Sequence, residues 1–366
     1  MNQKWTDIKG RYIRDPRYGH RLGKSYLASS KKKKPGYQDK ISEQSTDKYG
    51  FVHNGSMRDL PPTFNKSHFG IVVLGGSAAM GLGATDNSKT FSAVIEEDLR
   101  KKFKSEKISV INAGCGGYNS WDEIIYFLTE IILRKPQIVI SFTGLNDFCA
   151  EYFGSKYYDS RIPNTARSLE DVAEAIKIKG YKLSFLELIR HKFKNTFLYR
   201  KLINLNRKFK GEINLNEQNF VWGLENLKKQ YNPISASTFW LNQMSLLGAC
   251  KAHNIAHHIY LQPCYFWNYK KKLTIHEKEG IQFDQNLFKK DYEDLVKKYL
   301  IDLIKEAEIH KHQFDNNKYI FQSLHKTFED VEDQCYIDHA HLSNKGQEIV
   351  AKEMVRNILS SGIINF

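Results

Sequence analysis

The stretch that decides the fold is residues 69–77, which read FGIVVLGGS. An apolar run rich in β-branched residues that ends in glycines and a serine is typical of a buried strand entering a tight turn. Two similar runs follow, ISVI at 108–111 and IVISF at 138–142, and each leads into a turn of glycine and small polar residues. Because these runs are apolar without alternation, they indicate a parallel sheet covered on both faces.

Segments with helical spacing of apolar residues separate these strands, and the same alternation continues toward the C-terminus. We expect helices at 91–99, 121–133, 238–252 and 288–309, strands at 255–261 and 318–324, and a last helix at 349–359. Ser343 or Asn344 can cap that last helix. The pattern predicts an α/β fold: a three-layer α/β/α, doubly wound, mostly parallel five-stranded sheet, in which ligands bind at the carboxyl ends of the strands.

Two segments do not follow this alternation. Residues 1–67 form a basic N-terminal arm, packed on the core or extending from it, and residues 68–366 form the main domain. A helical insertion at about 151–235 leaves the domain just after Asn146, and its stretch 186–210 mixes apolar residues with eight lysines and arginines. We hypothesise that the insertion is a lid that selects substrate; a helix packed on the body with a solvated basic face explains the same pattern.

The charge of the chain is unevenly distributed. Its 366 residues include 55 Lys and Arg against 41 Asp and Glu, a formal net charge of +14. The first 60 residues hold 14 of these cations and 6 of these acids, so they account for more than half of the net charge. Basic segments can contact an anionic membrane or another polyanion, and we keep that contact as an alternative. No zinc-finger, RNA-recognition or helix-turn-helix pattern is present, so we do not expect a nucleic-acid partner.

Composition and cysteine spacing exclude several protein classes. A hydrophobic content of 41% is too high for a disordered chain. Five cysteines form no CxxC pair and leave one over, which excludes a disulfide scaffold: Cys115, Cys149, Cys250, Cys264 and Cys335. No apolar run approaches the roughly 18–20 residues of a membrane-spanning helix, and the first 30 residues contain no apolar core of a signal peptide. We therefore expect a cytoplasmic protein, with peripheral membrane contact as the alternative; its oligomeric state is left open.

Four turns, each after a strand or before a helix, carry residues that could take part in catalysis. Ser77 follows the first strand, and it is either a nucleophile or an ordinary helix N-cap. Gly117 ends a glycine-rich turn whose N–H groups could face an oxyanion, and Asn146 after the third strand could supply a carboxamide donor. Loop geometry and Asx turns explain these two residues equally well.

The fourth turn, Asp338-His339-Ala340-His341, gives the strongest signal. A carboxylate three residues before a histidine can accept from Nδ1 of His341 and leave Nε2 free to act as a base. Two histidines beside an aspartate also suggest a metal site. However, His339 should point away from His341, and no HExxH pattern supplies further ligands, so we expect neither a metal nor a cofactor.

Together the four turns resemble the blocks of the SGNH/GDSL hydrolase family, in the same order: GGSAAMG, NAGCGGYNS, GLND and DHAH. The resemblance implies a flavodoxin-like SGNH fold in which Ser77 is the nucleophile, His341 the general base and acid, and Asp338 the residue that orients it. It also implies an oxyanion hole made by the N–H groups of Ser77 and Gly117 and the side chain of Asn146. Gly114 and Gly116 are alternatives to Gly117.

One position departs from the family pattern. The usual block reads Gly-Asp-Ser, whereas this chain has Gly76 in place of the aspartate. The triad acid would come from Asp338, so the departure leaves activity possible but puts the hydrogen bonding beside the nucleophile in doubt.

The resemblance implies serine-dependent hydrolysis of carboxylic esters through an acyl-enzyme. We expect a small O-acyl group, such as acetyl on a carbohydrate, because aromatic residues that could stack on sugar rings follow the third and fourth strands. Packing in the core or at its rim explains these aromatic residues equally well. These residues are Tyr152, Phe153, Tyr157, Tyr158, Tyr260, Tyr265, Phe266, Trp267 and Tyr269. The alternatives are an O-acyltransferase that uses the same triad on a glycan, and a catalytically silent glycan- or lipid-associated binding protein.

Overall fold

The computed structural model describes residues 12–15, 19–28, 44–52, 54, 63–65, 67–152, 234–267, 270–288, 291–315 and 317–364. The expected insertion, including the cationic stretch 186–210, lies almost entirely outside these residues, as does much of the N-terminal arm.

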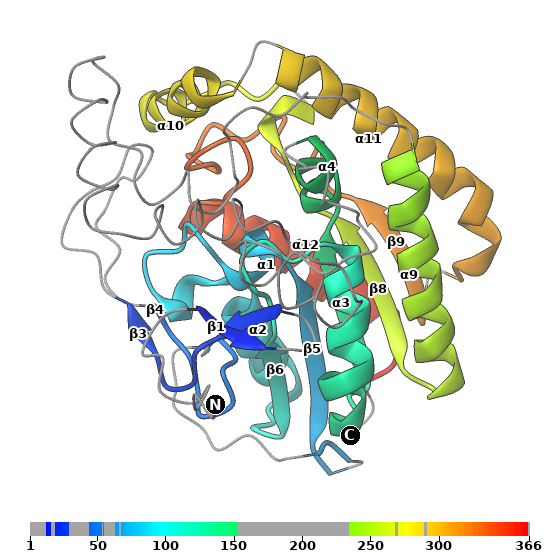
Figure 1. Ribbon diagram of the computed structural model, residues 1–366. Helices are drawn as coiled ribbons and strands as arrows, with labels where there is room; N and C mark the ends of the chain where they lie inside the picture. The colour runs from blue at the N-terminus through cyan, green and yellow to red at the C-terminus, as the bar shows by residue number, and fades with distance from the viewer. Residues whose placement is uncertain are drawn as a thin grey trace, which may run out of the picture.

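Five strands form one sheet, and each pairing between neighbours is parallel (Figure 1). In chain order they are β5 (Phe69–Gly75), β6 (Ile108–Asn112), β7 (Ile138–Thr143), β8 (Ala256–Leu261) and β9 (Tyr319–Ser323). Their order across the sheet is β6-β5-β7-β8-β9, so the connections wind one way from β5 to β6 and the other way from β7 onward. The carboxyl ends of β5 and β7 flank this switch point, where doubly wound sheets bind their ligands. The predicted α/β fold is confirmed.

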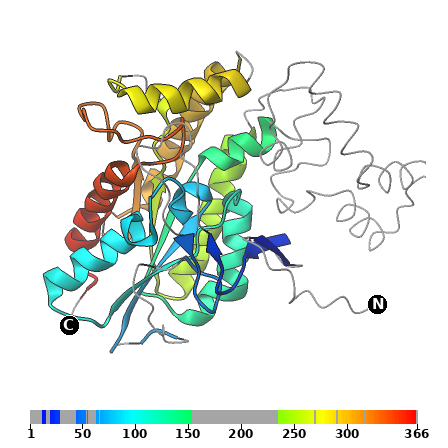
Figure 2. The ribbon, with the colours of Figure 1, turned by 90° about the vertical axis from the view of Figure 1, so that its left-hand side faces the viewer.

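Helices cover both faces of the sheet, as the edge-on view in Figure 2 shows. Along β5, Ile71 and Val73 pack with α2 (Phe91–Phe103) and α12 (Asn344–Ser360), whereas Val72 and Leu74 pack with α3 (Ser120–Tyr126) and α9 (Ile234–Ala252). A third cluster joins α9 to α4 (Leu145–Tyr152) and α11 (Asp291–His310). Since successive strand residues point to opposite faces, a continuous apolar run is what a sheet between two helix layers requires.

Several element boundaries differ from those expected. The expected helix at 121–133 is α-helical only to Tyr126 and then continues as a π turn (Phe127–Ile131) and a 3-10 turn (Ile132–Arg134). Ser343, rather than Asn344, caps α12 by accepting from the N–H of Gly346.

The helix expected from residue 288 begins at Asp291, and a separate helix, α10 (Ile275–Leu287), precedes it. No helix was expected at these residues, although Thr274 and Glu277 form a capping box at the start of α10. Shorter turns are α1 (Ser77–Met80), η2 (Asn87–Lys89), η5 (Tyr265–Trp267) and η6 (Lys311–Gln313).

The described parts of the N-terminal arm pack on the domain. Strands β1 (Tyr12–Asp15) and β2 (Gly19–Leu22) form an antiparallel hairpin, and β3 (Leu27–Ala28) pairs with β4 (Gln44–Ser45). The side chains of Leu22, Phe51 and Val52 are buried in the same hydrophobic cluster as residues of β5 and β6. These segments therefore share the core of the domain.

All five cysteines are buried free thiols. Among the helices that the structure describes, none combines the length and the apolar character needed to cross a membrane.

Candidate active site

Ser77 lies at the carboxyl end of β5, at the first position of α1. Because the first N–H groups of a helix have no acceptor within it, the N–H of Ser77 is not used by the helix. The Oγ of Ser77 lies 2.7 Å from Nε2 of His341, which comes from the turn before α12. The structure thus brings together two residues that are 264 positions apart in the chain.

Asp338 contacts the other ring nitrogen of His341, Nδ1. Its Oδ2 lies 2.6 Å from Nδ1 of His341, and its Oδ1 accepts the backbone N–H groups of Ala340 and His341 at 2.9 and 2.7 Å. Burial by itself would raise the pKa of Asp338, but the neighbouring His341 ring and these hydrogen bonds outweigh it and hold the pKa well below its usual range. The carboxylate is therefore ionised and accepts Nδ1–H, which leaves Nε2 as the acceptor facing the Ser77 hydroxyl.

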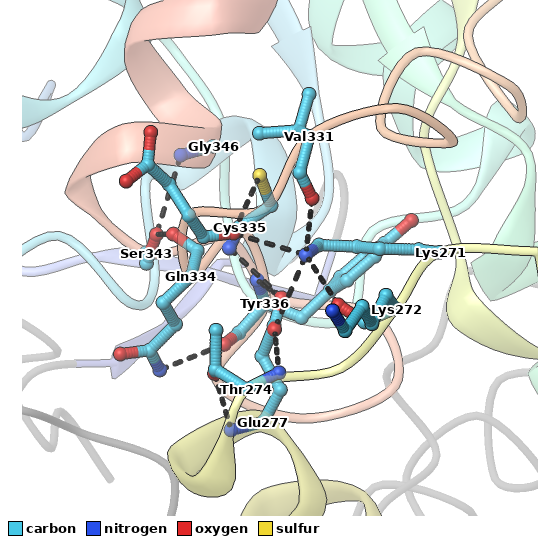
Figure 3. Close-up of polar contacts among 11 residues, drawn as sticks. Lys271, Lys272, Thr274, Glu277, Val331, Gln334, Cys335, Tyr336, Ser343 and Gly346 are labelled. Carbon is cyan, nitrogen blue, oxygen red and sulfur yellow. Dashed lines mark hydrogen bonds and ion pairs between the residues drawn. The ribbon is translucent and has the colours of Figure 1, made fainter.

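A buried glutamate fixes the backbone just before this turn (Figure 3). Oε1 of Glu277 accepts the N–H groups of Cys335 and Tyr336 at 2.8 and 3.0 Å, while Oε2 accepts the N–H of Thr274 at 2.8 Å. The Glu277 side chain is fully buried. One carboxylate therefore joins the start of α10 to the segment that leads into Asp338.

Lys271 balances the charge of that buried carboxylate. Its Nζ lies 3.2 Å from Oε2 of Glu277, and it donates to the carbonyl oxygens of Val331 and Asp333, both at 2.9 Å. The Lys271 side chain is only 2% exposed. We call Lys271 and Glu277 the clasp, because the two charges together hold residues 331–336 against α10. Nothing in the sequence beyond the capping box indicated this pair.

The side chain of Asn146 lies against Gly76, the residue that stands in place of the family's aspartate. Nδ2 of Asn146 donates to the carbonyl oxygen of Tyr118 at 2.7 Å. A Cβ atom on residue 76 would lie 2.0 Å from that Nδ2 and 3.0 Å from the Tyr118 oxygen. With the Asn146 amide in this position, residue 76 has no room for a side chain.

Asn112, the last residue of β6, holds the glycine-rich turn in place through two hydrogen bonds. Its side-chain Nδ2 donates to the carbonyl oxygen of Ala79 in α1, and its Oδ1 accepts the N–H of Gly114 at 3.0 Å. The N–H of Gly114 is therefore committed within the turn, which removes Gly114 as an oxyanion donor. Gly117 has φ +85°, in the left-handed region that favours glycine.

His339 points away from His341, as expected, and makes its own aspartate pair. Its Nδ1 lies 2.6 Å from Oδ2 of Asp284, which also accepts the N–H of His339 at 3.0 Å, and the hydroxyl of Tyr292 lies 3.2 Å from its Nε2. Potential metal-ligating atoms of Asp284, Asp338 and His339 lie within 4.8 Å of one another. The hydrogen bonds just described account for the positions of these groups without an ion. Asp284, in α10, was not anticipated from the sequence.

A buried polar network lies beneath the Asn146 turn. The Asp147 carboxylate accepts from the hydroxyl of Ser120 at 2.5 Å, and Nδ2 of Asn242 donates to the same hydroxyl at 2.9 Å. Nearby, Nε2 of Gln243 donates to Glu123 at 3.1 Å. Burial raises the pKa of Glu123 to about 8, despite hydrogen bonds that act in the opposite direction. Glu123 is therefore mostly protonated at neutral pH.

Of the nine aromatic residues expected to stack on a sugar, the structure describes five, and four of these are core residues. Tyr152, Tyr260, Phe266 and Trp267 are buried in the hydrophobic clusters on the two faces of the sheet, so that prediction is wrong for them. Tyr265 is partly buried. The remaining four lie outside the described residues: Phe153, Tyr157, Tyr158 and Tyr269.

Comparisons with known proteins give one family match. The family model for GDSL-like lipase/acylhydrolase matches residues 71–354. No curated protein matches the chain.

Solved structures with a similar chain path include three esterases or lipases. One is an acetyl xylan esterase, with 13% identity, a TM-score of 0.41, and coverage of 79% of this chain and 100% of that one. A GDSL-like lipase from Bacteroides thetaiotaomicron has 12% identity, a TM-score of 0.42, and coverage of 82% and 93%. A catalytic mutant of an acetylxylan esterase from Geobacillus stearothermophilus has 13% identity, a TM-score of 0.42, and coverage of 80% and 94%.

The matched residues extend from the strand before Ser77 to the helix after His341. They make up more than three quarters of the 366 residues. The chain therefore belongs to the GDSL-like lipase/acylhydrolase family, a family of carboxylic ester hydrolases.

Proposed function

We propose that this chain hydrolyses carboxylic esters through a covalent acyl-enzyme on Ser77, with His341 as general base and acid and Asp338 as the residue that orients it. The observation that carries the proposal is the continuous hydrogen-bonded series Asp338–His341–Ser77, with separations of 2.6 and 2.7 Å. A hydroxyl, an imidazole and a carboxylate in this order have the geometry of an activated nucleophile.

The reaction proceeds in two acyl-transfer steps. As Oγ of Ser77 attacks the ester carbon, Nε2 of His341 takes the hydroxyl proton, and the carbonyl electrons move onto the oxygen. The tetrahedral intermediate then expels the alcohol, which takes the proton back from His341 and leaves the acyl group on Ser77. Water repeats the sequence and releases the carboxylic acid, while Asp338 stays ionised throughout and stabilises the imidazolium.

The negative oxygen of both tetrahedral intermediates requires donors that are already in place. We assign this role to the N–H groups of Ser77 and Gly117 and to the side-chain amide of Asn146. A carboxamide nitrogen carries two hydrogens, so Asn146 can donate one to Tyr118 and direct the other to the substrate. The Tyr118 bond supports this assignment, because it holds the amide in a fixed orientation.

The substrate class that we propose is a small O-acyl ester, with acetyl on a carbohydrate as the leading candidate. The test compares release of acetate from an acetylated xylo-oligosaccharide with release from triacetin, and it monitors transfer to an added sugar. Faster release from the carbohydrate supports the proposal. Faster release from triacetin overturns the carbohydrate part, and an acylated sugar as the main product reassigns the chain as an O-acyltransferase.

The catalytic assignment is tested with Ser77→Ala, assayed on p-nitrophenyl acetate and with a fluorophosphonate probe. We expect Ser77→Ala to abolish turnover and labelling, because it removes the hydroxyl proposed to form the acyl-enzyme, and to keep the fold. Ser245→Ala, at an exposed position on α9, is the matched control and should behave as wild type. Wild-type hydrolysis by Ser77→Ala would exclude Ser77 as nucleophile. A wild-type protein that neither labels nor hydrolyses would favour a silent binding protein.

A further inference from the structure

The β1–β2 hairpin, drawn in dark blue in Figure 1, lies outside the residues that the family model matches and yet contacts the glycine-rich turn. Nε2 of His20, in β2, lies 2.9 Å from the carbonyl oxygen of Gly116. A carbonyl oxygen can only accept, so Nε2 carries the hydrogen and donates. His20 is 7% exposed, and its ring packs edge-on against Tyr118 with centroids 5.2 Å apart.

The peptide group that His20 contacts is the one that carries the N–H of Gly117. The carbonyl of Gly116 and the N–H of Gly117 belong to one planar trans peptide, so they point in opposite directions. Glycines on both sides make rotation of this peptide inexpensive, since no Cβ restricts it. A donor on the carbonyl fixes the direction of the N–H, and it also polarises the amide so that the N–H becomes a stronger donor.

The hairpin also reaches the Asn146 amide, by way of Tyr118. The hydroxyl of Tyr118 donates to the carbonyl oxygen of His20 at 2.6 Å, and the carbonyl of Tyr118 accepts from Nδ2 of Asn146 at 2.7 Å. Two of the three proposed oxyanion donors are therefore linked to the backbone or side chain of one residue in the hairpin.

We infer that His20 is a positioning residue for the oxyanion hole: its Nε2–H holds and polarises the Gly116–Gly117 peptide, so that the N-terminal hairpin completes the catalytic machinery of the family domain. This inference rests on the proposed function, in which Gly117 donates to the oxyanion. It assigns a catalytic purpose to a segment that the family pattern does not include.

Two substitutions separate the hydrogen bond of His20 from its packing. His20→Phe keeps an aromatic ring against Tyr118 but has no donor, whereas His20→Gln lacks the ring and carries an N–H at a similar reach. Loss of a direct oxyanion donor costs about 10²–10³-fold in kcat. Because His20 acts through the peptide, we expect a smaller loss for His20→Phe, about 10-fold in kcat with KM nearly unchanged. His20→Gln should recover most of the rate.

The assay measures kcat and KM on p-nitrophenyl acetate, the rate of fluorophosphonate labelling, and thermal unfolding for each variant. Lys24→Ala, at an exposed position of the same arm, is the control and should match wild type. A wild-type kcat for His20→Phe overturns the inference, and so does an equal loss of kcat in His20→Phe and His20→Gln, which would assign the effect to packing. Ser77→Ala is assayed in parallel: if it stays active, the proposed function fails, whereas an inactive Ser77→Ala with an active His20→Phe refutes only the role of His20.

Discussion

Two histidines of one four-residue turn each pair with an aspartate at the same distance, one aspartate from the turn itself and the other from α10. His341 pairs with Asp338, and His339 pairs with Asp284; the distance from Nδ1 to Oδ2 is 2.6 Å in both. In both pairs the carboxylate also accepts the backbone N–H of its own histidine, at 2.7 and 3.0 Å. The pairs differ in what faces the other ring nitrogen.

Nε2 of His341 faces the hydroxyl of Ser77, whereas Nε2 of His339 faces the hydroxyl of Tyr292. Burial raises the pKa of Tyr292 well above 10, and its ring lies between aromatic neighbours, stacked on Phe288 with centroids 4.2 Å apart. Ser77 instead lies at the sheet edge beside the turns that carry Gly117 and Asn146. An aspartate–histidine pair therefore becomes a candidate site only through the hydroxyl and the N–H donors placed beside it.

The largest contrast should come from removing the charge of each aspartate in turn. Asp338→Asn should lower kcat on p-nitrophenyl acetate by about 10⁴-fold, because an amide at this position favours the wrong tautomer of His341. Asp284→Asn should change kcat by less than about 10-fold while lowering the free energy of unfolding by about 1–3 kcal/mol, since it weakens buried hydrogen bonds. Steady-state kinetics and denaturant unfolding of both variants measure the difference. Equal losses of kcat would mean that the two pairs act as one unit.

Removing the cation of the clasp should lower the free energy of unfolding, because the clasp holds the segment before Asp338 against α10. Lys271→Met leaves the Glu277 carboxylate buried without its cation, which costs about 3–5 kcal/mol of unfolding free energy. The matched control is Lys270→Met, since the ammonium of Lys270 is largely exposed and 3.9 Å from Glu329; an exposed pair of this kind contributes about 0–1 kcal/mol. Urea unfolding of the two variants decides the question, and a loss in Lys271→Met no larger than in Lys270→Met would contradict the role of the clasp.

Glu123 is a buried acid that, unlike Asp338 and Asp284, has no imidazole partner among the described residues, and its effect shows only in the pH dependence of stability. The pKa of Glu123 is raised to about 8 from 4.5, so between these pH values the folded chain binds a proton that the unfolded chain has released. The contribution of Glu123 to stability therefore falls as pH rises through this window, and Glu123→Gln removes that dependence. We expect the variant to gain about 3 kcal/mol relative to wild type between pH 5 and pH 8.

Denaturant unfolding at several pH values gives the measurement for Glu123. Glu308→Gln, at an exposed position of α11, is the control and should follow the wild-type curve. Parallel pH profiles for Glu123→Gln and wild type would show that Glu123 ionises in the folded chain as it does in water.

The sheet could be predicted from the sequence because its strands are buried on both faces, which turns each into an uninterrupted apolar run. The grouping of Ser77, Asn146, Asp338 and His341 was also accessible, since parallel strands bring their following turns to one edge. The clasp could not be predicted from the sequence. Glu277 binds backbone N–H groups 58 and 59 residues away, and backbone groups leave no residue pattern.

Two other features needed packing information. Tyr260 was expected near the sheet edge as a sugar-stacking residue, but its ring is buried in the core and its hydroxyl accepts from Asn357 of α12. The close contact between Gly76 and the amide of Asn146 also joins two turns that lie about 70 residues apart in the chain, and no residue pattern indicates it. In both cases the deciding neighbour comes from a distant part of the chain.

The distance of 264 residues between Ser77 and His341 has a consequence for how activity arises during folding. The first turn of α12 is joined to Thr85 and to the first residue of α2, because Asn344 accepts the N–H of Thr85 and Gln347 accepts the N–H of Phe91. Contacts of such long range form late, because the intervening chain must first be ordered. A chain growing on the ribosome exposes its serine well before the base exists. On the proposed mechanism, ester hydrolysis begins only when α12 has docked, so activity would report that the two ends of the domain have come together.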